Sequence, residues 1–251
     1  MSHVVNLGDC LAGMDTLPDC SIDHVVCDPP YGEEAHTKQR RTKSGTQLEP
    51  IMDFASLDFA SLDFASRAFA RLVRRWVIVF CQVEQVDSWR KQLMAHGLDY
   101  VRTAVWIKPD GQPQYTGDRP GMGYESIVIA HRKGRKRWNG GGKHGVWRFN
   151  RTGPDDVERT GHQTQKPLAL MECLLRDFTD PGDLILDPFA GSGTTGVACK
   201  RMGRDFIGWE LNEKYQRIAQ HRIDATNEQL ELVRHKAPKA KQGAFKLAVG
   251  E

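Results

Sequence analysis

The stretch DPFAGSGTTG (Asp187–Gly196) decides the fold of this chain. It follows a buried-strand pattern, Asp183–Leu186, and precedes a helical pattern, Val197–Met202. Within it, GSGTTG matches the GxGxxG pattern, whose glycines make a tight strand-to-helix turn and let the backbone approach a ligand closely. A further strand, Asp205–Glu210, and a helix from Glu213 follow. This order predicts a nucleoside-bearing cofactor in an α/β sheet, although the motif alone also fits a tight turn without a ligand.

Two acidic residues narrow the choice of cofactor. Asp187 lies directly before the glycines, where a pyrophosphate would meet an unfavourable negative charge. Glu210 ends the following strand, a position from which a carboxylate can accept hydrogen bonds from ribose hydroxyls. A ligand with a cationic sulfonium and an ammonium group suits these acids better than a dinucleotide does. We therefore expect S-adenosylmethionine, with NAD as the disfavoured alternative.

A second site follows the apolar run Ile22–Cys27 and reads Asp28-Pro29-Pro30-Tyr31. The prolines fix φ and remove N–H donors, so the carbonyls are held in set directions. Asp28 and the Pro29 carbonyl can each accept an N–H from an exocyclic amine, while Tyr31 stacks on its ring. The alternative is a proline-terminated strand with a packed tyrosine. Both motifs end buried strands, so in a parallel sheet they would open into one crevice.

The remaining core patterns predict an α/β fold with a mostly parallel sheet covered on both faces. Further buried strands are expected at Trp76–Cys81, Tyr100–Ile107 and Ser126–Ala130, and helices at Glu84–His96 and Pro167–Phe178. A five-residue repeat, DFASL, occurs from Asp53 to Leu72, and its last copies depart from the first. A period of five matches neither helix nor strand, so we interpret the repeat as a local duplication within a helix.

The segment from His131 to Gly153 is basic, with eight lysines and arginines and no acidic residue. Trp138, Trp147 and Phe149 are interleaved with these cations. The run Asn139–Gly142 supplies a turn between two short arms. This pattern predicts a basic β-hairpin.

Composition and charge exclude several classes of protein. In 251 residues, 35 Lys and Arg face 32 Asp and Glu, and a net charge of +3 leaves any nucleic-acid surface to a local cluster. The absence of a long apolar run or a signal-peptide core predicts a cytoplasmic protein without membrane spans. The 6 cysteines form no CxxC pair, so we expect reduced thiols and no metal site.

Taken together, these motifs resemble the exocyclic-amino DNA methyltransferases, in the order typical of their circularly permuted β group. The similar stretches are GDCLAGMDTLPDCSIDHVVCDPPYG (Gly8–Gly32), VWIKP (Val105–Pro109), GYESIVIAHRKG (Gly123–Gly134), HQTQKP (His162–Pro167), DPFAGSGTT and GWELNEKY (Gly208–Tyr215). The resemblance implies a circularly permuted class I methyltransferase fold, with a mostly parallel seven-stranded sheet, helices on both faces and a small basic hairpin insertion. It divides the chain into a target-amine half (1–131), a recognition hairpin (132–160), a cofactor half (161–225) and a helix end with a basic tail (226–251).

The resemblance also assigns site residues. Catalysis falls to Asp28, Pro29, Pro30 and Tyr31, which would hold and stack on the flipped base. The implied cofactor pocket comprises Asp9, Cys10, Asp28, Thr164, Lys166, Asp187, Phe189, Gly191, Ser192, Gly193, Thr194 and Glu210. Asp9 would lie near the adenine, and Thr164 and Lys166 near the methionine end. A turn residue and a helix-start cation are the plain alternatives for Asp9 and Lys166.

The expected activity is N6-methylation of adenine in duplex DNA with S-adenosylmethionine as the donor. The leading Asp of DPPY is more typical of adenine enzymes, and N4-methylation of cytosine is the alternative. RNA or glutamine-amide methylation, and a catalytically silent DNA-binding protein, are further alternatives. The C5-cytosine enzymes are excluded because they need a Pro-Cys nucleophile, which this chain lacks.

Basic and aromatic side chains supply a candidate DNA surface, with a solvated face as the alternative for any single arginine. The expected contacts are His36, Lys38, Arg40, Arg41, Arg135, Lys136, Arg137, Trp138, Lys143, Trp147 and Arg148. This recognition segment is short, which predicts a short target, relaxed specificity, or recognition shared within a homodimer.

Overall fold

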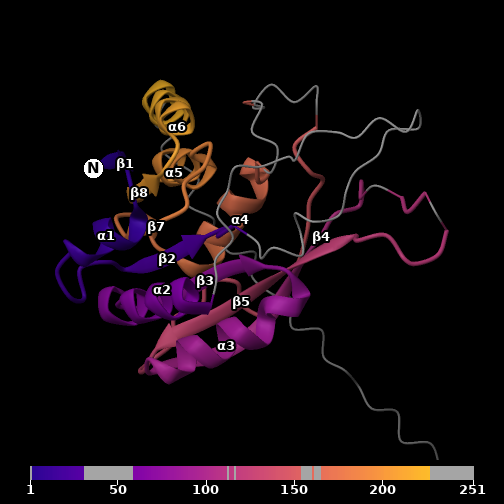
Figure 1. Cartoon of the computed structure of the whole chain (residues 1–251), viewed down its shortest axis with the longest axis horizontal. Coiled ribbons are helices and arrows are strands. Elements are labelled where there is room, and N and C mark those ends of the chain that lie inside the picture. The colour runs from indigo at the N-terminus through magenta and orange to yellow at the C-terminus, as the bar shows by residue number, and fades with distance from the viewer. Residues whose placement is uncertain are drawn as a thin grey trace, which may run out of the picture.

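A single sheet forms the centre of the computed structural model, which describes residues 2–30, 59–111, 113–115, 117–153, 160 and 165–226 (Figure 1). Within these residues the sheet has eight strands in the order β1-β8-β7-β2-β3-β5-β4-β6. Every neighbouring pair is parallel except the two that β5 makes with β3 and β4. The strands are β1 (His3–Leu7), β2 (His24–Cys27), β3 (Trp76–Cys81), β4 (Leu98–Ile107), β5 (Tyr124–Arg132), β6 (Val146–Arg148), β7 (Leu184–Asp187) and β8 (Asp205–Glu210).

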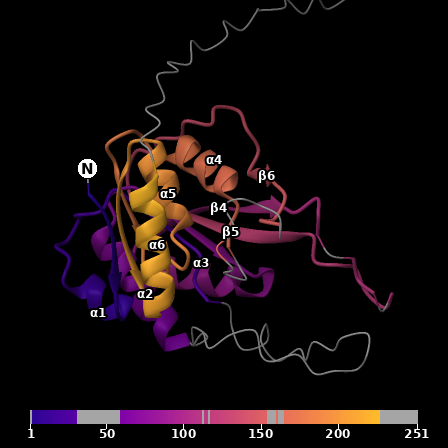
Figure 2. The same ribbon diagram turned by 90° about the horizontal axis from the view of Figure 1, so that it is seen from above.

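Helices cover both faces of the sheet, as expected (Figures 1 and 2). One core lies between the sheet and α4, α5 and α6, and a second lies between the sheet and α1, α2 and α3. The helices are α1 (Cys10–Asp15), α2 (Phe59–Leu72), α3 (Val86–Ala95), α4 (Leu168–Phe178), α5 (Thr194–Arg201) and α6 (Glu213–Ala225), with a short 3-10 turn, η2 (Val83–Gln85), before α3. In the described part of the chain, no helix combines the length and apolarity needed to span a membrane.

The central strands are apolar without interruption because both of their faces are covered. In β3, Ile78 and Phe80 point into the core beneath α4, whereas Val77 and Val79 point into the core beneath α2 and α3. All of these side chains are fully buried. A strand buried on both sides has no polar face, so its sequence shows no alternation.

The helix predicted for the DFASL repeat is confirmed over residues 59–72, and residues 53–58 lie outside the described part. Its buried side chains include Leu62, Ala65, Phe69 and Leu72, spaced three or four positions apart. A helix places such positions on one face, so the duplicated sequence buries different members of each copy.

The chain order creates a crevice between β7 and β2. These strands are parallel neighbours, yet the chain continues from β2 to β3 on one side and from β7 to β8 on the other. Such a reversal leaves a gap between the connecting segments at the carboxyl ends of the strands, where α/β proteins bind ligands. Asp28 follows β2 and Asp187 ends β7, so both lie at this gap.

Two fold predictions are wrong. The sheet has eight strands rather than seven, and it includes β1, an edge strand in which Val5 is the only fully buried residue. The basic hairpin does not form, because residues 133–145 contain no strand and β6 pairs in parallel with β4. Trp138 packs on Phe178 of α4, and the indole of Trp147 donates to Asp177 of the same helix. Burial of the two indoles against α4 draws the arms away from each other.

Candidate active site

Four adjacent strands bring four acidic residues to one edge of the sheet. Asp9 follows β1, Glu210 ends β8, Asp187 ends β7 and Asp28 follows β2. These strands are mutually parallel, so their carboxyl ends meet at the same edge. For the residues described, the glycine-rich loop and Asp28 thus follow parallel strands at the same end of the sheet, as the sequence predicted.

The glycine-rich loop is shaped by hydrogen bonds to two of these acids. Asp187 accepts the Phe189 N–H at 3.0 Å through Oδ1 and the Thr195 hydroxyl at 2.6 Å through Oδ2. Glu210 Oε2 accepts the Gly191 N–H at 3.0 Å. The loop thus turns between the ends of β7 and β8 with its backbone facing the crevice edge.

Gly193 is the position in the loop where only glycine fits. Its φ is +78°, and a Cβ there would lie 2.8 Å from the Cβ of Ala219 on α6. The residue precedes α5, so the loop, α5 and α6 pack as one unit. Arg222 of α6 supports the loop from behind by donating to the Ser192 carbonyl at 2.5 Å.

The acids of this edge carry excess negative charge. Burial, together with the charges of Asp28 and Glu210, raises the pKa of Asp187 to about 7, against the lowering effect of its two hydrogen bonds. Burial also raises the pKa of Glu210. A cationic ligand would relieve this repulsion, whereas a diphosphate would add to it. The donor set therefore fits S-adenosylmethionine better than a dinucleotide.

Glu210 also has the capacity to hold ribose hydroxyls. Its carboxylate already accepts the N–H groups of Gly191 and, at 2.8 Å, Asn212. The Leu211 N–H also acts on this carboxylate, and since an ionised carboxylate offers about four acceptor positions, it keeps capacity for a ribose hydroxyl. The side chain is 7% exposed, at the rim of the crevice rather than on an open surface.

The remaining predicted cofactor residues surround the same edge. Asp9 caps α1 by accepting the Leu11 N–H at 2.9 Å, and Gly8 donates to the Glu210 carbonyl, which places Asp9 and Cys10 beside Glu210. Burial and the charges of Asp9 and Asp187 raise the pKa of the Cys10 thiol to about 12, so this cysteine is neutral. Ser192 and Thr194 are buried and Phe189 is half-buried at the turn into α5.

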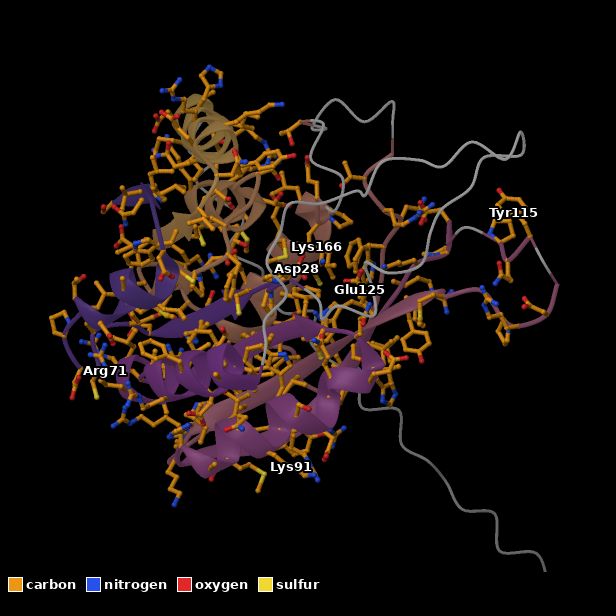
Figure 3. The ribbon with its side chains drawn as sticks, viewed as in Figure 1. Asp28, Arg71, Lys91, Tyr115, Glu125 and Lys166 are labelled. Carbon is orange, nitrogen blue, oxygen red and sulfur yellow. The ribbon has the colours of Figure 1, made fainter. Side chains whose placement is uncertain are left out.

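Lys166 lies against Asp28 (Figure 3). Its Nζ is 2.5 Å from Asp28 Oδ2, and it also contacts Glu125 of β5 at 3.2 Å. Sequence reasoning gave Glu125 and its partner Lys108 no role, although both occur in stretches that resemble the family. The available signal was position: they flank the segment between β4 and β5, which emerges at the same edge as Asp28.

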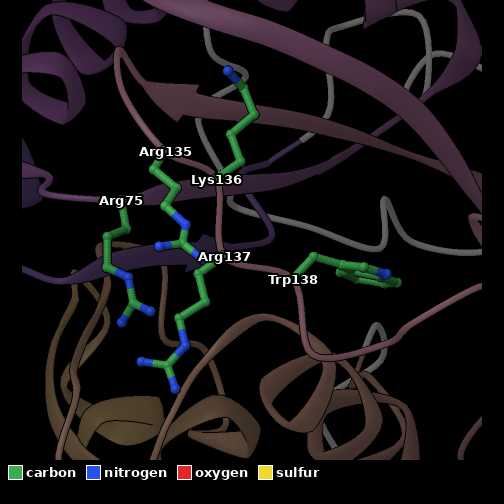
Figure 4. A pocket seen from close by; sticks show the side chains of 5 residues that line it. All are labelled: Arg75, Arg135, Lys136, Arg137 and Trp138. Atoms are coloured by element: carbon green, nitrogen blue, oxygen red, sulfur yellow. The ribbon is translucent and has the colours of Figure 1, made fainter.

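Part of the predicted DNA surface lies at the amino ends of the parallel strands, opposite to the carboxyl ends near Asp28. Arg135, Lys136, Arg137 and Trp138, with Arg75, line a pocket of about 680 Å³ (Figure 4). Arg75 directly precedes β3, which marks the amino end of the parallel strands. Strands of four to six residues separate this pocket from Asp28 by about 13–20 Å. This placement does not support the predicted role of these residues beside a base held at Asp28.

Several basic side chains of the same segment are tied to acids. Lys136 pairs with Asp99 at 2.9 Å, Arg137 with Asp180 at 3.1 Å and Lys143 with Asp177 at 2.6 Å. These pairs hold the segment against the body of the protein.

The two tryptophans and Arg148 differ in exposure. Trp147 is 5% exposed within the core, which does not favour its predicted contact with DNA. Trp138 is partly buried and packs edge-on against Phe178, with ring centroids 4.7 Å apart. Arg148 is exposed and pairs in register with Ile107, which brings it to the carboxyl edge.

The remaining predicted residues, Tyr31, His36, Lys38, Arg40, Arg41 and Thr164, lie outside the described part of the chain. Among the described residues, no group of three or more His, Cys, Asp and Glu side chains could hold a metal ion.

Comparison with known proteins gives consistent matches over most of the chain. The N6/N4 methyltransferase family model, described as DNA methylase, matches residues 22–221. The type II methyltransferase M.HinfI of Haemophilus influenzae is 27% identical over 243 residues, which covers 86% of this chain and 67% of that protein. The crystal structure of the M1.HpyAVI-SAM complex superposes with a TM-score of 0.69 at 26% identity, covering 88% of this chain and 98% of that one. The cytosine-N4-specific PvuII DNA methyltransferase shares the fold, with a TM-score of 0.68 at 16% identity and 87% coverage of both chains.

Proposed function

The chain belongs to the N6/N4 DNA methylase family, and from this premise we propose that it methylates the N6 amino group of adenine in duplex DNA. The observation that carries the proposal is that Asp28, the glycine-rich loop after Asp187, and Glu210 all lie at the carboxyl ends of neighbouring parallel strands. The segment after β2 can hold a target amine while the loop after the neighbouring strand β7 holds a methyl donor. In-line transfer requires such proximity.

S-adenosylmethionine is the methyl donor of this family and supplies an activated methyl group on a sulfonium. In this chain Glu210 would hold the ribose, Asp9 and Phe189 would lie near the adenine, and Asp187 would face the cationic end. The glycines at 191 and 193 let the backbone approach the ligand. We carry the order of the two halves, target amine before cofactor, into the proposal as a circular permutation of the fold.

Asp28 acts by accepting hydrogen bonds. An exocyclic amine is a poor nucleophile, because its lone pair is delocalised into the ring, and it is far too weak an acid for a carboxylate to deprotonate. Acceptance of its N–H groups by Asp28 and the Pro29 carbonyl favours the pyramidal, electron-rich form reached in the transition state. The same contacts stabilise the positive charge that develops on nitrogen, and the proton leaves after transfer.

Adenine is proposed over cytosine because aspartate, not serine, leads the DPPY motif. The fold similarity to a cytosine-N4 enzyme does not favour either base, since the two chains are only 16% identical. Both amines present two N–H groups in the plane of a ring, so Asp28 and the Pro29 carbonyl serve the same chemistry in either case.

A base paired in a duplex cannot reach this crevice, so the proposal includes base flipping. The DNA would approach the carboxyl edge, where Arg148 is exposed and where the chain continues from Asp28 towards the basic residues His36 to Arg41. Cations at this edge would contact phosphates and position the duplex.

The test is a product analysis. Purified protein is incubated with S-adenosylmethionine and unmethylated duplex DNA, the DNA is digested to nucleosides, and the products are identified by mass spectrometry. We expect N6-methyladenine from the wild type and none from Asp28→Ala. N4-methylcytosine would overturn the choice of base, and the absence of any methylated nucleoside would overturn the proposed activity on DNA.

A further inference from the structure

Four alternating charges begin at Asp28 and continue through Lys166 and Glu125, which Figure 3 labels, to Lys108 beside β4, on the side of β2 away from β7. Lys166 Nζ lies 2.5 Å from Asp28 Oδ2 and 3.2 Å from Glu125 Oε2. Lys108 Nζ donates to the other oxygen of Glu125, Oε1. The side chains of Lys166, Glu125 and Lys108 are 8%, 14% and 13% exposed. Asp28 is 24% exposed, so two anions and two cations alternate from a partly exposed carboxylate into a nearly closed interior.

Aromatic rings fix both lysines from the side. Lys166 Nζ lies 5.1 Å from the centroid of Phe80, and Lys108 Nζ lies 4.7 Å from that of Trp106. Attraction between an ammonium and an aromatic face strengthens where water is excluded. The rings come from β3 and β4, so the rigid sheet itself sets where the two ammonium groups lie.

Stability alone does not explain this cluster. Removing the charges of Lys166, Glu125 and Lys108 from water costs several kcal/mol per ion, and apolar residues of similar volume commonly stabilise a core as well or better. Burial opposes ionisation of Glu125, but the charges of Lys166 and Lys108 outweigh it and hold the pKa of Glu125 at about 2. Burial likewise opposes the charge of Lys166, but Asp28 and Glu125 keep the pKa of Lys166 above its usual value.

The groups around Asp28 show that Lys166 supplies a positive charge beside a carboxylate that also faces an acid and neutral thiols. Asp187, at the end of the adjacent strand β7, faces Asp28 closely enough for their charges to interact. Two thiols also lie near: burial and the charge of Asp28 raise the pKa of Cys81 to about 12 and that of Cys27 well above its usual value, so both are neutral. Lys166 brings a cation into direct contact with Asp28.

We propose that Lys166 is a positioning residue for methyl transfer, an inference that rests on the function proposed above. Its ammonium keeps the Asp28 carboxylate ionised and fixed at the crevice, and Glu125, anchored by Lys108, keeps Lys166 in place. The ionised form is required because a carboxylate only accepts hydrogen bonds, whereas a protonated carboxyl also donates. Lys166 thereby controls whether Asp28 can accept the target N–H.

The first experiment measures the single-turnover rate of methyl transfer against pH at saturating S-adenosylmethionine and DNA. The acidic limb of the profile is the fall in rate at low pH. In Lys166→Met we expect this limb to move to higher pH by about one to three units, since an adjacent opposite charge lowers the pKa of a carboxyl by that amount. Lys166→Arg keeps the charge and should keep the wild-type limb. Circular dichroism at each pH checks that the folded fraction of every variant stays constant, because only a folded fraction that changes with pH would alter the shape of the profile.

Two further variants separate charge from position. Glu125→Gln removes an anion, so the acidic limb should not move to higher pH. The rate should nevertheless fall at least tenfold, because Lys166 loses one of its two carboxylate contacts. Lys91→Met removes the same charge from the exposed face of α3, far from the cluster, and should leave the profile unchanged (Figure 3). A wild-type rate in Glu125→Gln would overturn the role of Glu125.

A second readout does not depend on activity. The carboxyl carbon of Asp28 is followed by ¹³C NMR against pH, with its signal assigned by its loss in Asp28→Asn. The titration midpoint in Lys166→Met should lie one to three units above that of the wild type. An unchanged midpoint, or weakened S-adenosylmethionine binding with an unmoved acidic limb, would overturn the inference and place Lys166 at the methionine end of the cofactor. An inactive wild type would overturn the proposed function, while the NMR comparison would still decide the contact between Lys166 and Asp28.

Discussion

Asp187→Asn should stabilise the protein, and the gain should depend on pH. Burial and the charges of Asp28 and Glu210 raise the pKa of Asp187 from its usual 3.8 to about 7. Between these values the folded state holds a proton that the unfolded chain has released, so raising the pH through this window lowers stability. The full cost, about 4 kcal/mol, is present above pH 7.

Asparagine should avoid this cost without losing the local contacts. Its amide oxygen can accept the Phe189 N–H, and its amide nitrogen can donate to the Thr195 hydroxyl, which also accepts. Relative to the wild type, the gain should be about 2 kcal/mol at pH 5 and about 4 kcal/mol at pH 8. Any constant offset from altered hydrogen bonds would not vary with pH.

The assay is urea unfolding followed by tryptophan fluorescence from pH 5 to pH 8, without S-adenosylmethionine. Asp183→Asn is a control of opposite sign. Burial favours the neutral form of Asp183, but hydrogen bonds from His24 and the Asp180 N–H and the charge of Arg75 hold its pKa below the usual range. That variant should lose stability at every pH above 4. A gain for Asp187→Asn that is equal at pH 5 and pH 8, or a loss at pH 8, would refute the reasoning.

Three further predictions test the loop and the core. Trp147→Ala should cost about 3–5 kcal/mol in thermal unfolding, because the indole is buried, and should leave the affinity for DNA unchanged; unchanged stability with weakened DNA binding would instead support its predicted contact with DNA. Gly193→Ala should cost about 2–3 kcal/mol, since left-handed strain adds to the contact with Ala219, whereas Gly203→Ala, with φ +70° and open space, should cost about 1 kcal/mol; equal losses would contradict the packing argument. Binding of S-adenosylmethionine near pH 7 should release protons, because its cations favour ionised Asp187; calorimetry in buffers of different ionisation enthalpy should show this release in the wild type and not in Asp187→Asn, and identical heats in all buffers would exclude it.

Patterns within short stretches determined most of the architecture. The continuous apolar run at Trp76–Cys81 and the pattern around Asp187–Gly196 predicted buried strands and a tight turn from strand to helix, and both are confirmed. These features depend on local chemistry. Apolar side chains are buried wherever other elements cover a strand, and glycine adopts the left-handed backbone conformation of position 193 without strain. The same reasoning correctly predicted helices on both faces of a mostly parallel sheet.

Patterns failed where distant segments compete for the same side chain. Two arms flanking Asn139–Gly142 predicted a hairpin, but Trp138 packs on Phe178 of α4 and the indole of Trp147 donates to Asp177 of the same helix. The weakly apolar β1 becomes a strand because β8 presents an open edge to it. Neither outcome is visible within a window of neighbouring residues.

The sequence by itself determined which residues could carry the chemistry: the acids at the strand ends, the glycines between them and the DPPY motif. Only the tertiary structure decided which of them meet. Lys166 reaches Asp28 across 138 positions of chain, and Glu125 of β5 and Lys108 just after β4 join them, although the sequence assigned neither residue a role. The physical reason is that strand order is set by the packing of whole faces, and the electrostatic partners of a buried carboxylate follow from that order rather than from its neighbours in sequence.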